Sequence, residues 1–224
     1  MEKDEIASLA YDTHKIIWRN RVKLNIDSGP LVEMLHPSIG AAAHGIRYEA
    51  CTDLGRFGHR GEHFTVAGLL NRPQGLIQVS DLFCETTQRF TGAHELGHYI
   101  LHDDEVMHRD RPIVGGSLAQ IKRTAKEWQA DHFAACFLMP EKLVFKAFEN
   151  RFGSRKPFEF GDNAAYWLRP HDPESVFNSN IDEQAAILAT APRYGGVLFP
   201  KLCDEFRVSI SAMAIRLIEL GLVA

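Results

Sequence analysis

The sequence predicts an α+β fold in which a small group of strands precedes two long, mostly buried helices. Strand-like segments occupy residues 47–54 and 64–80, rich in β-branched and apolar residues and broken by turn signals. Helical patterns with capping candidates follow from about residue 85 onward. Strands first and helices afterwards is the order typical of an α+β fold.

Each element is predicted from its own local pattern. Residues 4–21 read as an amphipathic helix, and Gly29-Pro30 separates it from a short helix at 31–35. Residues 47–54 form one predicted strand. Residues 64–80 form two more, which turn at Asn71-Arg72-Pro73-Gln74-Gly75.

Length and composition indicate one substantial core with a small appended part, since the chain has 224 residues of which 45% are hydrophobic. We divide it into a main domain with the N-terminal helices (1–150), an aromatic-rich insertion (151–180) and C-terminal helices (181–224). The insertion could cover a site, bind a partner or simply pack on the core. Its aromatic residues are Phe152, Phe158, Phe160, Tyr166, Trp167 and Phe177.

Several classes of protein are disfavoured by composition. The sequence has no run of about 18 apolar residues and begins with a charged segment, so we expect a cytoplasmic protein without a membrane anchor. The cysteines are scattered without a C-x-x-C pair and read as reduced thiols. A net charge of −4 argues against strong sequence-independent binding to nucleic acid.

The most informative motif is His94-Glu95-Leu96-Gly97-His98. On a helix, His94 and His98 share a face and can reach one metal ion. Glu95 points to the neighbouring side, where it can take a proton from a water on that metal. The alternative, two histidines satisfied within the core, is disfavoured because the surrounding helix is apolar and a metal best satisfies three buried polar groups.

His102 continues the four-residue spacing but is not expected to be a ligand. At about 1.5 Å per residue, His94 and His102 lie about 12 Å apart along one helix, whereas a Zn–N bond is about 2 Å. His102 is therefore a candidate to support the ligands, to contact substrate or to end the helix in solvent.

A third ligand is expected on a second helix, residues 117–138, which stops before Pro140. Glu127 and Asp131 are again four residues apart. Glu127 would bind the metal, and Asp131 would accept the free ring N–H of a ligand histidine. A solvated acidic face is the alternative interpretation of this pair.

Both segments together resemble a known family. Residues 89–102 read R-F-T-G-A-H-E-L-G-H-Y-I-L-H, and residues 127–140 read E-W-Q-A-D-H-F-A-A-C-F-L-M-P. Two separated motifs in this order are similar to those of the ImmA/IrrE-type metallopeptidases. Two positions depart from the family pattern without touching the chemistry: Gly92 replaces a larger apolar residue, and Phe137 replaces a leucine.

The resemblance implies a gluzincin-like fold, Zn²⁺ held by His94, His98 and Glu127, and Glu95 as the general base of peptide hydrolysis. It also implies a bacterial, phage or mobile-element origin and a protein substrate, which would be a helix-turn-helix transcriptional repressor or an antitoxin-like partner. The residue that stabilises the oxyanion stays open. Its candidates are His102, Tyr99, His108, Tyr166 and Tyr194. The competing hypothesis is a non-catalytic protein with zinc as a structural element, or a DNA-binding regulator.

The C-terminus has the spacing of a helix-turn-helix, with helices at 198–206 and 210–220 around a turn at 207–209. The second helix carries only Arg216 as a basic residue, and residues 181–224 have a net charge of −1, with four basic and five acidic residues. DNA readers normally present a basic stripe, so we expect a structural or partner-docking role rather than DNA binding.

Overall fold

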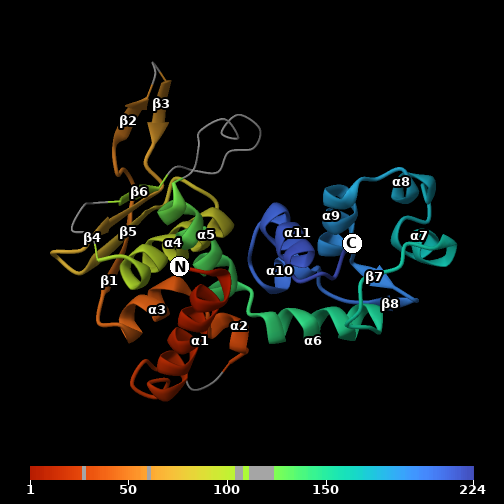
Figure 1. Cartoon of the computed structure of the whole chain (residues 1–224), viewed down its shortest axis with the longest axis horizontal. Coiled ribbons are helices and arrows are strands. Elements are labelled where there is room, and N and C mark those ends of the chain that lie inside the picture. Colours follow the sequence, from red (N-terminus) through yellow and green to blue (C-terminus); the bar gives the residue numbers. More distant parts are fainter. Residues whose placement is uncertain (27–28, 60–61, 104–107, 111–123) are drawn as a thin grey trace. The chain divides into compact units, whose positions relative to one another are not determined.

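The computed structural model describes residues 1–26, 29–59, 62–103, 108–110 and 124–224 (Figure 1). The chain divides into two compact units, Met1–Leu138 and Met139–Ala224. Across these described ranges, no helix combines the length and the apolar character needed to span a membrane.

The first unit combines helices with a small sheet, as the predicted α+β class requires. Its elements are α1 (Lys3–Arg19), α2 (Leu31–Met34), α3 (Pro37–Ala43), β1 (Arg47–Cys51), β2 (Arg56–His59), β3 (Glu62–Thr65), β4 (Gly68–Asn71), β5 (Leu76–Ser80), α4 (Glu85–Leu101), β6 (His108–Asp110) and α5 (Ala125–Leu138).

The main sheet has the strand order β1-β5-β4-β6. β1 runs parallel to β5, while β4 is antiparallel to both β5 and β6. The predicted turn at residues 71–75 joins β4 to β5, and Gly75 has the positive φ of 56° that favours glycine. β2 and β3 form a separate hairpin that the sequence analysis missed.

Helix α4 lies between the sheet and the other helices of this unit. It packs against β4, β5 and β6 on one side and against α3 and α5 on the other. α1 in turn packs on α5 through residues spaced three or four apart, which is the apolar stripe expected of an amphipathic helix. The buried residues of that stripe are Ile6, Ala10, Thr13 and Ile17.

α5 ends at Leu138, before Pro140, as predicted, because the residue before a proline is disfavoured in the helical conformation. Its predicted beginning at residue 117 lies outside the described residues. On the buried side of α5, the rings of Phe133 and Phe137 stack on each other.

The second unit consists of short helices and one small hairpin. Its elements are α6 (Glu141–Phe152), α7 (Asp162–Leu168), α8 (Glu174–Phe177), α9 (Ile181–Thr190), β7 (Arg193–Tyr194), β8 (Val197–Leu198), α10 (Leu202–Glu205) and α11 (Ile210–Glu219).

The C-terminal helices differ from the prediction in extent. Residues 198–206 were expected to form one helix, but β7 and β8 pair as a hairpin across Gly195 and Gly196, both with positive φ. Two such glycines favour a tight hairpin turn, so the chain reverses there and α10 is left with a single turn. α11 agrees with the expected second helix.

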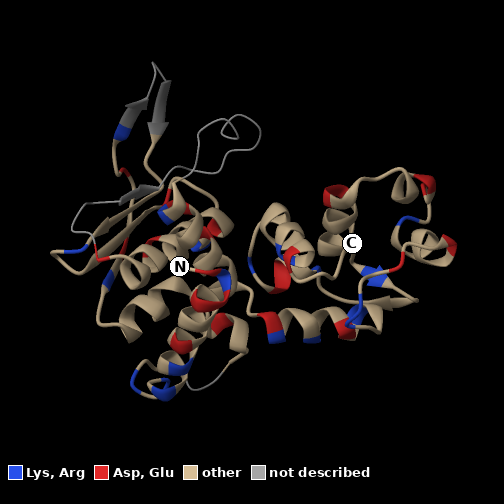
Figure 2. Cartoon of the chain, in the orientation of Figure 1, with Lys and Arg blue, Asp and Glu red and all other residues tan. Residues whose placement is uncertain are grey.

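Arg216, the one basic residue of α11, faces inward. Its side chain is only 6% exposed, its Nε donates to the carbonyl of Met139 at 3.1 Å, and its Nη1 lies 3.2 Å from Glu219. Figure 2 shows Lys and Arg interspersed with Asp and Glu over the elements of this unit. The basic residue of the expected recognition helix is thus used within the unit.

The aromatic residues of segment 151–180 divide into two groups. Phe152 makes edge-to-face contacts with Phe158 and with Tyr194, whose ring centroids lie 5.3 and 5.4 Å away. In contrast, Tyr166 and Phe177 are 57% and 47% exposed. Part of the segment therefore packs on its own unit, and part of it faces solvent in that unit.

Candidate metal centre

Helix α4 presents His94 and His98 on one face, as expected from their spacing of four residues. The two side chains are 2% and 1% exposed, and their rings meet edge to face with centroids 4.6 Å apart. Burial of two imidazoles in an apolar helix layer requires polar partners. Those partners come from α5.

Glu127, near the beginning of α5, brings its carboxylate to both histidines. Its Oε2 lies 3.4 Å from His94 Nε2, and its Oε1 lies 3.3 Å from His98 Nε2. The two Nε2 atoms are 2.9 Å apart. One ligand atom from each residue lies within 4.8 Å of the others, so the three residues form a group that could hold a metal ion.

The separations fit a tetrahedral metal site. Nitrogen and oxygen ligands about 2.0–2.1 Å from one ion in tetrahedral geometry lie about 3.3–3.4 Å from each other. The two Nε2 atoms are 2.9 Å apart, and each lies 3.3 or 3.4 Å from a different oxygen of Glu127, so the three side chains surround a space of about this size. The Glu127 side chain is 35% exposed, in contrast to the two buried histidines. The donor set and its spacing therefore fit a metal ion.

Glu127 is held in its ionised form. Burial alone would raise its pKa, but hydrogen bonds and charge interactions with His94 and His98 outweigh burial and lower the pKa below its usual range. An ionised carboxylate beside two imidazoles is a ready cation ligand.

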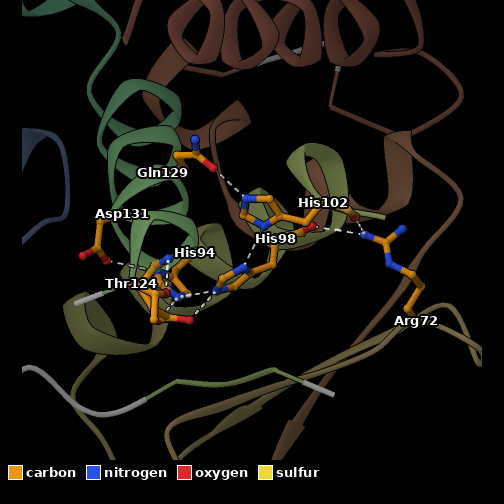
Figure 3. Close-up of polar contacts among 8 residues, drawn as sticks. Arg72, His94, His98, His102, Thr124, Gln129 and Asp131 are labelled. Atoms are coloured by element: carbon orange, nitrogen blue, oxygen red, sulfur yellow. Dashed lines mark hydrogen bonds and ion pairs between the residues drawn. The ribbon is translucent and has the colours of Figure 1, made fainter. Parts of the chain in front are cut away.

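Asp131, one turn after Glu127, lies behind His94. Its Oδ1 is 3.0 Å from His94 Nδ1, on the opposite side of the ring from the Nε2 that faces Glu127. Because a carboxylate only accepts, His94 Nδ1 is the donor of this bond, and Nε2 on the Glu127 side of the ring is the nitrogen that could bind a metal. Figure 3 shows Asp131 reaching the ring from α5.

His102 lies behind His98 in a corresponding position. α4 ends at Leu101, and His102 has extended backbone with φ −128° and ψ 140°, so its ring turns back toward the helix. Its Nδ1 is 3.1 Å from His98 Nδ1, and its Nε2 is 3.0 Å from Gln129 Oε1 (Figure 3). Both ring nitrogens thus face protein groups, which favours a supporting role over contact with substrate.

Glu95 follows His94 on α4 and lies against the sheet. Its side chain is fully buried, and β4 passes it at Gly68. A Cβ atom built on Gly68 would lie 3.2 Å from Glu95 Oε1 and only 2.4 Å from Thr91 Cγ2. The absence of a side chain on Gly68 therefore leaves the room that the carboxylate occupies.

Arg72, in the turn between β4 and β5, binds the end of α4. Its Nη2 donates to the carbonyl of His98 at 3.1 Å, to that of Tyr99 at 2.7 Å and to that of His102. The guanidinium also lies 4.6 Å from the Tyr99 ring centroid. A cation at a helix C-terminus forms hydrogen bonds with carbonyls that have no partner within the helix, and it complements the helix dipole. Arg72 therefore anchors the β4–β5 turn to α4, the helix that carries His94 and His98.

The predicted oxyanion candidates His108, Tyr166 and Tyr194 stay predictions. The side chain of His108 lies outside the described residues, while Tyr166 and Tyr194 belong to the second unit. Gln129, Arg72 and Gly68 were not predicted from the sequence to lie at this group. Of these, only Gln129 carried a signal, since it lies two residues from each of Glu127 and Asp131.

Comparison with known proteins adds one finding. The model of a family described as Peptidase_M78, IrrE N-terminal-like domain, matches residues 43–162. This stretch is more than half of the chain and includes the main sheet, α4 and α5. No curated protein matches the chain significantly.

Proposed function

Because this chain belongs to the Peptidase_M78 family of ImmA/IrrE-type metallopeptidases, we propose that it is a zinc-dependent endopeptidase. The observation that carries the proposal is the group of His94, His98 and Glu127, whose ligand atoms lie within 4.8 Å of one another. The proposed peptidase domain is residues 1–150, followed by an insertion at 151–180 and C-terminal helices at 181–224.

The donor set supports zinc as the metal. Two imidazoles and one carboxylate are a common catalytic zinc set, in which a fourth position is left open for water or substrate. Calcium and magnesium prefer all-oxygen sites, and the buried histidines disfavour them. A purely structural zinc site would normally complete four protein ligands, and the described residues bring three together.

Zinc at this position supplies Lewis-acid activation of water and of the scissile carbonyl. Glu95 is the proposed general base: its carboxylate takes a proton from the attacking water and passes it to the leaving amine. It lies on the same helix as both histidine ligands, one residue after His94. Asp131 would hold the ring of His94 in place, and His102 that of His98.

We further propose a zincin-like arrangement in which the substrate binds as an extended strand. Among the residues that the structure describes, β6 is the last strand of the sheet on the side of β4, and α4 contacts both strands. An extended peptide added beside such an edge would be held by main-chain hydrogen bonds. Its scissile bond would then lie over α4.

The family resemblance supplies the proposed substrate, a helix-turn-helix transcriptional repressor cut at one or a few sites. Arg216 faces inward and is not presented to DNA, which supports a structural or partner-docking role of the C-terminal helices over direct DNA recognition.

Co-expression tests this proposal. The protein is produced together with a repressor-like protein encoded beside it, and fragments are identified by mass spectrometry. We expect a defined fragment with the wild type and none with Glu95→Gln, which keeps all three ligands. Equal fragment yield from both forms would remove Glu95 from the mechanism. A partner that binds but is never cut would favour the non-catalytic alternative.

A further inference from the structure

The two ligand histidines are supported by different partners. His94 is backed by the carboxylate of Asp131, whereas His98 is backed by a second imidazole, that of His102. A carboxylate can only accept a hydrogen bond, but an imidazole can donate or accept. The tautomer of His98 is therefore not determined by His102 alone. It depends on what holds His102.

His102 is held by Gln129, which in turn contacts the backbone carbonyl of Met1. Gln129 Nε2 lies 3.3 Å from the carbonyl oxygen of Met1, and a backbone carbonyl can only accept. The amide nitrogen of Gln129 must therefore face Met1, which turns the amide oxygen toward His102 Nε2, 3.0 Å away. That oxygen is also an acceptor only, so His102 Nε2 must carry a proton.

The proton on His102 Nε2 also determines the direction of the hydrogen bond between His102 and His98. A neutral His102 with its proton on Nε2 has a bare Nδ1, which accepts a hydrogen bond from His98 Nδ1 at 3.1 Å. In the zinc-loaded protein, His98 would then carry its proton on Nδ1 and direct the lone pair of its Nε2, which lies beside Glu127 and His94, to the metal. Each bond in the series fixes the direction of the next.

We infer that His102 and Gln129 are positioning residues that fix the tautomer of His98 and direct its Nε2 to the metal. The burial of His102 supports this role, since its side chain is only 8% exposed and a hydrogen bond away from water is electrostatically stronger. Partners behind a ligand histidine typically change metal affinity by about 10–100-fold when removed. The inference rests on the proposed metal site.

The tautomers can be observed directly. Long-range ¹H–¹⁵N spectra of the zinc-loaded full chain, labelled at histidine, distinguish protonated from bare ring nitrogens. We expect His102 to be neutral with its proton on Nε2, and His98 to be protonated on Nδ1. A proton on His102 Nδ1 would overturn the inference, because that nitrogen could then no longer accept from His98.

Matched variants test the consequence for metal affinity. His102→Asn keeps an acceptor oxygen near the position of Nδ1, whereas His102→Leu removes it at similar volume. We expect the zinc dissociation constant, measured by chelator competition, to rise about 10–100-fold for Leu and to stay within a few-fold of the wild type for Asn. Equal affinity of the Leu variant and the wild type, or equal weakening in both variants, would contradict the inference.

Gln129 provides a second pair that does not depend on tolerance at the buried His102. Gln129→Glu keeps an acceptor for His102 Nε2, and Gln129→Leu removes it. We expect the same contrast in zinc affinity, with circular dichroism of the metal-free forms showing that both fold. A wild type that binds no zinc would instead refute the proposed site itself, so the two failures are distinguishable.

Discussion

Gly97 of α4 lies against Ala130 of α5 so closely that a Cβ on Gly97 would come 3.2 Å from the Cα and carbonyl oxygen of Ala130. The contact is one residue from the ligand His98 and three residues from Glu127. It sets the distance between the two helices that carry the ligands, so the geometry of the metal group depends on a glycine that has no chemistry of its own.

Gly97→Val should therefore separate α4 from α5. Overpacking of this kind costs about 1–3 kcal/mol, and backbone atoms of Ala130 cannot rotate away as a side chain could. We expect a lower unfolding midpoint in denaturant and weaker zinc binding. Ala42→Val, at an exposed helical position of α3, is the control. Unchanged zinc affinity in Gly97→Val would show that the helix spacing does not control the site.

Asp131→Asn tests the support behind His94. The amide can present its nitrogen to the ring, which would compete with the proton on His94 Nδ1 and make the tautomer ambiguous. We expect zinc affinity to fall by about 10–100-fold while the stoichiometry at saturation is unchanged. Chelator competition measures both quantities, and an affinity equal to that of the wild type would exclude this role.

Gly68→Ala should affect catalysis more than metal binding. The added Cβ would lie 3.2 Å from Glu95 Oε1, whereas the three atoms nearest to it include none from His94, His98 or Glu127. Displacing a general base commonly lowers the rate by about 10²–10⁴-fold. We expect zinc affinity within a few-fold of the wild type and a large loss of substrate cleavage.

The double variant Gly68→Ala with Thr91→Ser separates stability from catalysis. Serine lacks the Cγ2 atom that the new Cβ would meet at 2.4 Å, so thermal stability should recover. Cleavage should stay low because Glu95 is still crowded. Recovery of both properties together would mean that Gly68 matters only for packing.

The candidate site could be predicted best where two functional residues lie four positions apart on one helix. The i, i+4 pairs at His94 and His98 and at Glu127 and Asp131 predicted which side chains would come together, because helix geometry places such residues on one face. The proline at 140 likewise predicted the end of α5.

Features that depend on tertiary contact could not be predicted. Gly92 departs from the family pattern, and the structure shows why: a Cβ there would lie 2.4 Å from the hydroxyl of Tyr48 on β1. Gln129 and His102 meet only because α4 ends at Leu101. The hairpin β2–β3 was missed because its sequence does not alternate apolar and polar residues.

Cys84, directly before α4, is expected to be the most reactive thiol. It is exposed, and hydrogen bonds with Thr86 and then Thr87 lower its pKa from 9.0 to about 7. A lower pKa means that the reactive thiolate is present at lower pH, so alkylation by iodoacetamide should reach half its maximal rate near pH 7. Burial raises the pKa of Cys203, which should react slowly.

Thr86→Val is the matched variant for this measurement, because it removes the hydroxyl that contributes most to the lowered pKa of Cys84. The midpoint of its alkylation profile should move to higher pH. A wild-type midpoint near pH 9, or identical profiles for both proteins, would contradict the prediction.

The central claim is that His94, His98 and Glu127 hold the zinc ion on which peptide cleavage depends. Cleavage of the repressor-like partner by metal-free protein, measured while zinc is added back, tests it most directly. We expect the rate to rise in proportion to bound zinc and to level off at one ion per chain, with neither binding nor cleavage recovered in Glu127→Ala. Cleavage by the wild type that proceeds equally well without zinc would contradict this claim. Full recovery of cleavage by the Glu127→Ala variant when zinc is added would contradict it as well.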